Sequence, residues 1–319
     1  MKPYVIGVDL GGTNTVFGIV DATGNILQEN SIKTAQFTSA TDFVNASVAS
    51  INKIVAAVGG IDKIQGMGVG APNANYYTGT IEFAPNLVWA HDGIVHLADM
   101  FASELGIPVR MTNDANAAAL GEQAYGAARG MKDFIMLTLG TGVGAGIVTN
   151  GKMIYGHDGF AGELGHVNMD RSEKARQCGC GLRGCLEAYC SATGMARTAR
   201  EMLETSDRPS LLRNKPLHEI ESLDVFHAAK QGDEVAKEVF QFTGTMLGYA
   251  CANFMAFSSP EAFIFFGGLC KSGDLIMRPI KEAYSKAALP IFKKKAKFII
   301  SDLMDKNDAI LGASALGWE

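Results

Sequence analysis

The chain has 319 residues, of which 47% are hydrophobic and 19% are charged. This length suits about two domains, and the hydrophobic share is that of a packed globular protein, which excludes a disordered or fibrous chain. The 28 basic residues against 33 acidic ones give a net charge of −5, so the overall positive field of proteins that bind nucleic acid or anionic membranes is missing. The composition favours small ligands, and we expect no nucleic-acid or membrane partner.

The first apolar run ends at Asp9, too early for a secretory signal, and no apolar stretch approaches the roughly 18 residues of a membrane span. These features predict a cytoplasmic protein, in which thiols stay reduced. Four of the six cysteines lie between Cys178 and Cys190, which indicates a metal site rather than disulfides. We expect Cys190, Cys251 and Cys270 to be buried thiols.

The first third of the chain is predicted to hold three strands, a helix, a strand, a second helix and a strand. The first helix begins after Ser39 or Thr41 and ends at Gly59 and Gly60, and the second ends at Gly106. A loop rich in Asn, Tyr and Pro separates the fourth strand from the second helix. The strands are expected over residues 4–10, 15–20, 26–32, 64–69 and 109–112, and the helices over 44–58 and 97–105.

The pattern then starts again with a strand over 134–139, a glycine turn over 140–144 and a strand over 145–149. This weak repeat predicts a duplicated domain whose two glycine turns face each other across a cleft. A final helix from Asn307 is expected to return to the first domain, which gives domains 1–115 plus 303–319 and 116–302. The other predicted elements are helices over 224–231 and 233–257, a strand over 262–266, a helix after Gly273 and a strand over 297–301.

Both glycine turns could hold phosphate, because a residue without Cβ leaves backbone N–H groups open to close approach. The first turn, Asp9 to Thr13, adds a carboxylate at a strand end that could hold Mg²⁺ through water. The second turn, Leu139 to Gly146, has no acidic residue and is the better direct phosphate cradle. The alternative interpretation is that both are ordinary tight hairpin turns.

Two other nucleotide motifs fit the sequence poorly. Gly140, Gly142 and Ala145 match a loose dinucleotide fingerprint, but a strand follows in place of a helix and no acidic residue ends a second strand about 20 positions on. Gly151-Lys152 is followed by Met153, whereas a P-loop requires Ser or Thr there.

Asn113 and Asp114 end a predicted strand and open an alanine-rich helix that reaches Tyr125. They are either an ordinary helix cap or a functional pair. In the second case the carboxylate of Asp114 accepts a proton from a substrate hydroxyl while Asn113 binds a neighbouring hydroxyl.

One imidazole and three thiols predict a tetrahedral structural zinc site made by His166, Cys178, Cys180 and Cys185. The spacing departs from the common CxxC knuckle, and four protein ligands leave no open position for catalysis, so the metal would shape loop 163–187. Glu163 and Glu187 bracket this loop. They are either solvated carboxylates or acceptors for the hydroxyls of a polyhydroxylated ligand.

Taken together, these motifs resemble the ROK family of sugar kinases, within the actin and hexokinase superfamily. The resemblance covers essentially the whole chain and implies an α/β, two-domain, actin-like ATPase fold, related to ribonuclease H, with a duplicated βββαβαβα core and an interdomain cleft. It is carried by Asp9 to Thr13, Pro85-Asn86-Leu-Val-Trp89, Asn113-Asp114, Leu139 to Gly146, Ala161-Gly-Glu163-Leu-Gly-His166, Cys178 to Cys185, Gly184-Cys185-Leu-Glu187-Ala and Phe266-Gly267-Gly268-Leu.

The resemblance implies an ATP-dependent hexose kinase that phosphorylates the 6-hydroxyl of glucose and uses Mg²⁺ and a structural Zn²⁺. Asp114 would be the general base, Asp9 would position Mg²⁺, and His166 would offer one ring nitrogen to zinc and the other to a hydroxyl. It also suggests a homodimer or homotetramer. The implied sugar-binding residues are Asn86, Asn113, Asp114, Glu163, His166 and Glu187, and the implied nucleotide-binding residues are Asp9, Gly11, Gly12, Thr13, Thr141, Gly142, Gly267 and Gly268.

Several alternatives remain. Fructose, mannose, allose or N-acetylmannosamine could replace glucose, because Val88 stands where the family often has Pro, in a motif that borders the sugar pocket. Polyphosphate could replace ATP as the donor. The chain could also be a sugar-sensing regulator or an inactive sugar-binding protein, although its first strand at Tyr4 leaves no helix-turn-helix before it and Asp9, Asp114 and Gly142 are all present.

Overall fold

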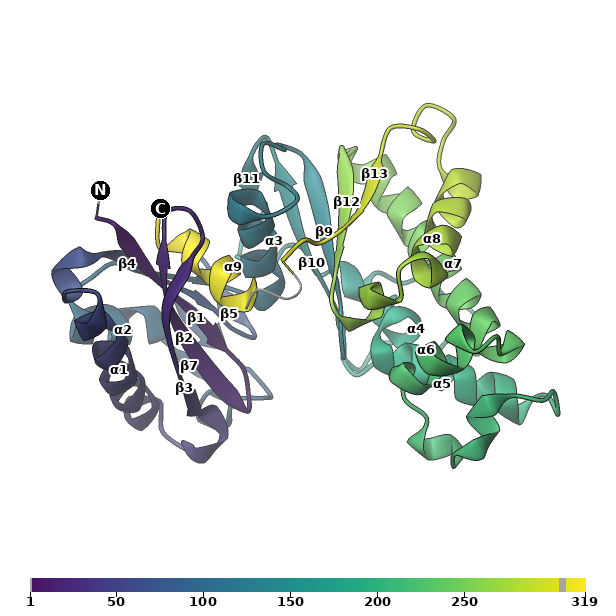
Figure 1. The fold of residues 1–319 in the computed structure, drawn as a ribbon, viewed down its shortest axis with the longest axis horizontal. Helices are drawn as coiled ribbons and strands as arrows, with labels where there is room; N and C mark the ends of the chain where they lie inside the picture. Colours follow the sequence, from purple (N-terminus) through teal and green to yellow (C-terminus); the bar gives the residue numbers. More distant parts are fainter. Residues whose placement is uncertain (1, 304–307) are drawn as a thin grey trace. The chain divides into compact units, whose positions relative to one another are not determined.

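The computed structural model describes residues 2–303 and 308–319, and it forms two compact units (Figure 1). Unit 1 comprises Met1–Lys132, Gly146–Gly162 and Ser301–Glu319, and unit 2 comprises Asp133–Ala145 and Glu163–Ile300. Residues 116–132 thus lie in unit 1, and the helix over 114–125 that opens this stretch packs against the C-terminal helix. The domain limits given above, 1–115 plus 303–319 and 116–302, stay a prediction.

Unit 1 is built on a five-stranded sheet with the order β3-β2-β1-β4-β8. The first three strands are antiparallel, and β4 and β8 run parallel to β1. Helices α1 and α2 pack together beside the sheet, while α9 lies on the strands and against α3. The bounds are β1 Tyr4–Leu10, β2 Asn14–Asp21, β3 Ile26–Lys33, β4 Ile64–Gly70, β8 Val109–Thr112, α1 Ala40–Ala57, α2 Leu97–Leu105, α3 Asp114–Tyr125 and α9 Asp308–Leu316.

The alternation of side chains along β1 explains these two layers. Ile6 and Val8 join a core that contains Phe43 of α1, whereas Val5 packs in a separate cluster with Ile310 of α9. Glycines let α9 lie directly on the strands: a Cβ on Gly68 would stand 1.9 Å from the carbonyl oxygen of Ala313. Larger residues there would separate the helix from the sheet.

A second five-stranded sheet has the order β11-β10-β9-β12-β13, which repeats the order of the first. This repetition confirms the duplicated core predicted from the two glycine hairpins. Strand β12 pairs in parallel with both β9 and β13, and α7 packs along α8. The bounds are β9 Phe134–Leu139, β10 Val143–Thr149, β11 Lys152–Met153, β12 Ala262–Phe266, β13 Lys297–Ile300, α4 Glu187–Cys190, α5 Ala192–Glu204, α6 Ser222–Lys230, α7 Glu234–Ser258 and α8 Asp274–Ala287.

The structure adds elements that the sequence pattern missed. The region predicted as a loop after β4 contains a small antiparallel sheet of β5 (Ala74–Asn75), β6 (Thr80–Glu82) and β7 (Ile94–Val95). Helix α5 was also absent from the prediction. The predicted start of the last helix, Asn307, lies outside the described residues. Within the described part of the chain, no helix is both long and apolar enough to span a membrane.

Candidate functional site

Unit 1 places two of the predicted carboxylates at one edge of its sheet. Asp9 of β1 pairs with Gly70 of β4, and Gly70 pairs with Thr112 of β8, so these parallel strands end side by side. Asp114 follows two residues after Thr112, at the first position of α3. With about 4.8 Å between neighbouring strands, β1 and β8 are about 10 Å apart. A ligand of a few ångströms could therefore lie within reach of both side chains.

The residues that open α3 are both a helix cap and an accessible acid. The side chain of Asn113 accepts a hydrogen bond from the Asn116 N–H at 2.7 Å, which confirms the cap interpretation for this residue. Asp114 accepts from the Ala115 N–H at 2.8 Å through Oδ1, and its side chain is exposed. The capping role is thus filled by Asn113, and the carboxylate of Asp114 remains accessible to a substrate.

The first glycine turn lies against the loop that carries Asn86. The Gly11 N–H donates to the carbonyl of Asn14 at 3.0 Å, as in a tight hairpin turn. A Cβ on Gly12 would stand 2.7 Å from the carbonyl oxygen of Asn86, so a larger residue would push the two segments apart. Asn86 and Thr13 are both exposed beside this turn.

The second glycine turn adjoins Gly267 and Gly268, two of the predicted nucleotide-binding glycines, in unit 2. Thr138 of β9 pairs with Phe266 of β12, so the segments that follow these parallel strands leave the same edge. Gly267 has a φ of 104° and a Cβ there would lie 2.5 Å from the Leu139 carbonyl oxygen, which makes glycine the residue that fits this position.

A cavity of about 450 Å³ opens at this edge. Its size is that of a small-molecule site. Leu223 and Phe226 of α6 give it an apolar wall, which sequence reasoning missed because nothing in the α6 pattern separates these residues from an ordinary helix face. The lining consists of Leu139, Gly140, Thr141, Ala192, Ser222, Leu223, Phe226, Phe240, Gly268, Leu269, Lys271 and Ser272.

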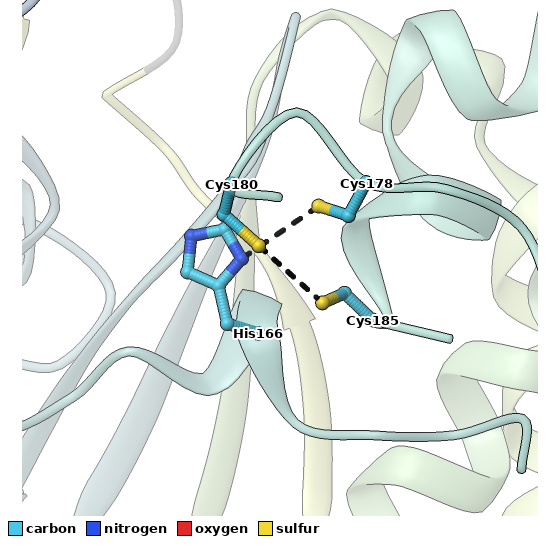
Figure 2. A group of neighbouring side chains, drawn as sticks. All are labelled: His166, Cys178, Cys180 and Cys185. Carbon is cyan, nitrogen blue, oxygen red and sulfur yellow. Dashed lines mark hydrogen bonds between the residues drawn. The ribbon is translucent and has the colours of Figure 1, made fainter. Parts of the chain in front are cut away.

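The four predicted zinc ligands come together in unit 2, and Figure 2 shows their side chains turned toward one another. All four ligand atoms lie within 4.8 Å of one another. Cys178 Sγ is 3.9 Å from His166 Nδ1, and Cys180 Sγ is 3.6 Å from Cys185 Sγ. A tetrahedral zinc with bonds of about 2.3 Å to sulfur requires sulfurs about 3.8 Å apart. The donor set and its spacing therefore fit zinc.

The protonation of the thiols sets a cost that a cation must overcome at this place. Burial raises the pKa of Cys178 to about 12, and burial together with the hydrogen bond to Cys180 raises the pKa of Cys185. Burial also acts on Cys180, but hydrogen bonds from the Leu182 N–H and from Cys178 outweigh it and lower the pKa of this exposed thiol. Zn²⁺ binds thiolates, so the metal must displace the protons that burial retains.

The ring of His166 has two different neighbours. Nδ1 faces Cys178, while Nε2 lies 3.8 Å from Oε2 of Glu163. With Nδ1 directed at the metal ligands, the second nitrogen is left for a polar ligand beside Glu163. Glu187 lies at the other end of the loop, with its Oε1 3.5 Å from Cys178 Sγ.

The metal loop is also fixed by Arg176, which sequence reasoning missed. The Arg176 side chain is 7% exposed and its guanidinium lies 4.6 Å from the centre of the Tyr189 ring. It donates to the carbonyls of Ala188 and Gly194 and forms an ion pair with Glu201. These contacts tie the loop to α4 and α5.

Two sheets of the same strand order, each with a glycine turn at the edge where its parallel strands end, define an actin-like ATPase fold. The chain belongs to the ROK family, whose sequence model matches residues 5–319. The protein is 36% identical to a glucokinase of Halalkalibacterium halodurans over 99% of this chain and 94% of that protein. It is 34% identical to a glucokinase of Thermotoga maritima over 99% of this chain and 97% of that protein.

A solved structure extends the comparison. The ROK family glucokinase of Streptomyces griseus, in complex with glucose and AMPPNP, superimposes with a TM-score of 0.77 at 33% identity, over 98% of both chains.

Proposed function

We propose that this protein is an ATP-dependent hexose kinase that transfers the γ-phosphoryl group of ATP to the 6-hydroxyl of glucose. The observation that carries the proposal is the exposed carboxylate of Asp114 at the sheet edge that also holds Asp9. Phosphoryl transfer needs alignment and charge neutralisation: Asp114 could align the attacking hydroxyl, and Asp9 could hold the Mg²⁺ that would supply positive charge. The full-length similarity to glucokinases supports ATP and glucose as the substrates.

In unit 1, we assign the proton transfer to Asp114. Its carboxylate takes the proton of the sugar hydroxyl as that oxygen attacks the γ-phosphorus, and the bond from phosphorus to the bridging oxygen of ADP breaks. Asn113 and Asn86 would bind neighbouring hydroxyls. Asp9 would hold Mg²⁺ through water, which would supply positive charge to the phosphates, and Gly11, Gly12 and Thr13 would contact these phosphates.

In unit 2, we assign the nucleotide to the cavity beside the second glycine turn. Thr141 and Gly142 would contact phosphate through the open backbone, and Gly267 and Gly268 would let adenosine lie against the chain. The apolar wall formed by Leu223 and Phe226 suits a flat base.

We assign the sugar-binding role in unit 2 to Glu163, His166 and Glu187. A zinc ion held by His166, Cys178, Cys180 and Cys185 would supply a rigid structural centre and no chemistry of its own. The neighbouring Glu163 and the outer nitrogen of His166 then offer an acceptor and a donor to the sugar hydroxyls.

A coupled ADP-release assay with Mg-ATP tests the proposal across glucose, fructose, mannose, allose, N-acetylglucosamine and N-acetylmannosamine. We expect glucose to lead in kcat/KM by at least about tenfold. A lead by another hexose would keep the kinase and refute glucose as its substrate. The kinase itself would be refuted if no sugar supported turnover while one raised the melting temperature, because that is the result of binding alone.

A further inference from the structure

The glycine turn that lines the nucleotide cavity is held from outside by one short segment, residues 187–193. Glu187 Oε2 accepts a hydrogen bond from the Val143 N–H at 3.0 Å. The Ala192 N–H donates to the Gly140 carbonyl at 2.8 Å, and the Thr193 hydroxyl donates to the Thr141 carbonyl at 3.1 Å. Of these three contacts, the one made by Glu187 involves a charged side chain.

The glycine at position 142 is explained by the same carboxylate. A Cβ on Gly142 would lie 2.5 Å from Glu187 Oε2, well inside contact distance. Gly142 does not adopt a positive φ, so its backbone conformation does not require glycine. At Gly140, in the same turn, a Cβ would meet nothing within 4 Å. The absence of a side chain at Gly142 therefore leaves room for the carboxylate of Glu187.

The other oxygen of Glu187 faces the metal loop. Oε1 lies 3.5 Å from Cys178 Sγ, which places the carboxylate between the metal loop and the turn. Val143 is 5% exposed, and its N–H would lose this charged acceptor if Glu187 moved. A buried donor without an acceptor is costly, so the turn would rearrange to find water or another partner.

We propose that Glu187 is a positioning residue for the nucleotide turn, in addition to any contact it makes with the sugar. The inference rests on the proposed function, because it assigns the cavity to the nucleotide. It predicts that Glu187 sets the affinity for ADP even when no sugar is present. A residue that contacts only the sugar would leave that affinity unchanged.

The test is calorimetric titration of Mg-ADP into the zinc-loaded protein without sugar, using wild type, Glu187→Ala, Glu187→Gln and the control Glu204→Gln. Glu204 is exposed at the end of α5 and belongs to no part of the site. We expect Glu187→Ala to weaken ADP binding about tenfold, the size of one lost hydrogen bond to a charged group. Glu187→Gln should stay within about threefold of wild type, because its amide oxygen can still accept from Val143.

A double-mutant cycle with Gly142→Ala makes the test specific. The new methyl should displace the carboxylate, so Gly142→Ala should also weaken ADP binding about tenfold, and adding Glu187→Ala should cost little more because both changes remove one hydrogen bond. This variant also decides the case if Glu187→Ala does not fold or does not retain zinc, since ADP binding by Gly142→Ala at wild-type affinity would overturn the inference.

The outcomes separate the two proposals. If wild type binds ADP and Glu187→Ala binds it equally, the positioning role is wrong and the kinase stands. Fully additive losses in the cycle would also reject the shared hydrogen bond. If wild type itself binds no Mg-ADP, the assignment of the cavity fails, and the proposed function fails with it.

Discussion

Replacing Asp114 with asparagine separates the proposed proton transfer from the folding of α3. Asparagine has the same shape, and its Oδ1 can still accept from the Ala115 N–H. The change removes one negative charge from the first turn of an exposed helix end, which costs about 0.3–1 kcal/mol. Loss of a general base lowers kcat by about 10²- to 10⁴-fold, equivalent to about 3–5 kcal/mol in the activation barrier. The catalytic loss should thus exceed the loss of stability several-fold.

The assay compares kcat from ADP release at saturating glucose and Mg-ATP with the free energy of unfolding and with glucose affinity by titration. Asp42→Asn is the matched control, because Asp42 is an exposed carboxylate in the first turn of α1 and has no proposed part in the reaction. We expect the control to retain wild-type kcat and both variants to lose similar stability. An Asp114→Asn protein with kcat within tenfold of wild type would exclude Asp114 as the base.

Three further perturbations address other parts of the molecule. Cys178→Ser should reduce the amount of zinc bound per chain below one ion, as measured by elemental analysis, and should weaken glucose binding as well. A metal-free variant of full activity would contradict the zinc assignment. Phe226→Asp should raise KM for ATP at least about tenfold, because it puts a charge in the apolar wall of the cavity, and should leave KM for glucose unchanged. Equal increases in both KM values would reject the assignment of this cavity to the nucleotide. Asp233→Ala should lower the free energy of unfolding by about 1–2 kcal/mol at pH 7, because Asp233 caps α7. Burial raises the pKa of Asp233, but hydrogen bonds from the Ala236 N–H, the Ser210 hydroxyl and the Leu211 N–H outweigh it and lower the pKa below 3.8. Urea titrations should therefore show the stability difference between wild type and Asp233→Ala above about pH 4, and this difference should fade as the pH falls through the lowered pKa. A difference that persists undiminished at pH 2 would refute this account.

The sheets could be predicted because their signals are local. Four strands have the predicted limits. Three of them, Tyr4–Leu10, Phe134–Leu139 and Ala262–Phe266, are apolar runs that end at glycines. The repeated glycine hairpin then predicted that the second sheet would repeat the first. The N-cap Ser39 and the end of α2 before Gly106 were equally readable, because caps and left-handed glycines act within one turn of the helix.

The small sheet of unit 1 could not be read in the same way. Strands β5 and β7 have only two residues each, too few for an alternating pattern. The contacts that fix β5 are distant in the sequence: Asn75 donates to the carbonyl of Asp158 at 2.8 Å, and the ring of Tyr76 stacks on Tyr155 at 3.8 Å. These partners lie about 80 residues along the chain. The local spacing of residues in the sequence does not indicate such distant pairs.

At the candidate metal site, a local sequence motif predicted the ligands but not the distant contacts that hold the loop. The motif alone named His166 and the three cysteines, because glycine-separated thiols are rare outside metal loops. It did not name Arg176, whose partners Tyr189, Gly194 and Glu201 lie on the following helices. These contacts join the loop to α4 and α5, beside the four ligand atoms that lie within 4.8 Å of one another. In the proposed zinc-bound protein, the bond from the metal to one ring nitrogen would fix His166 in place.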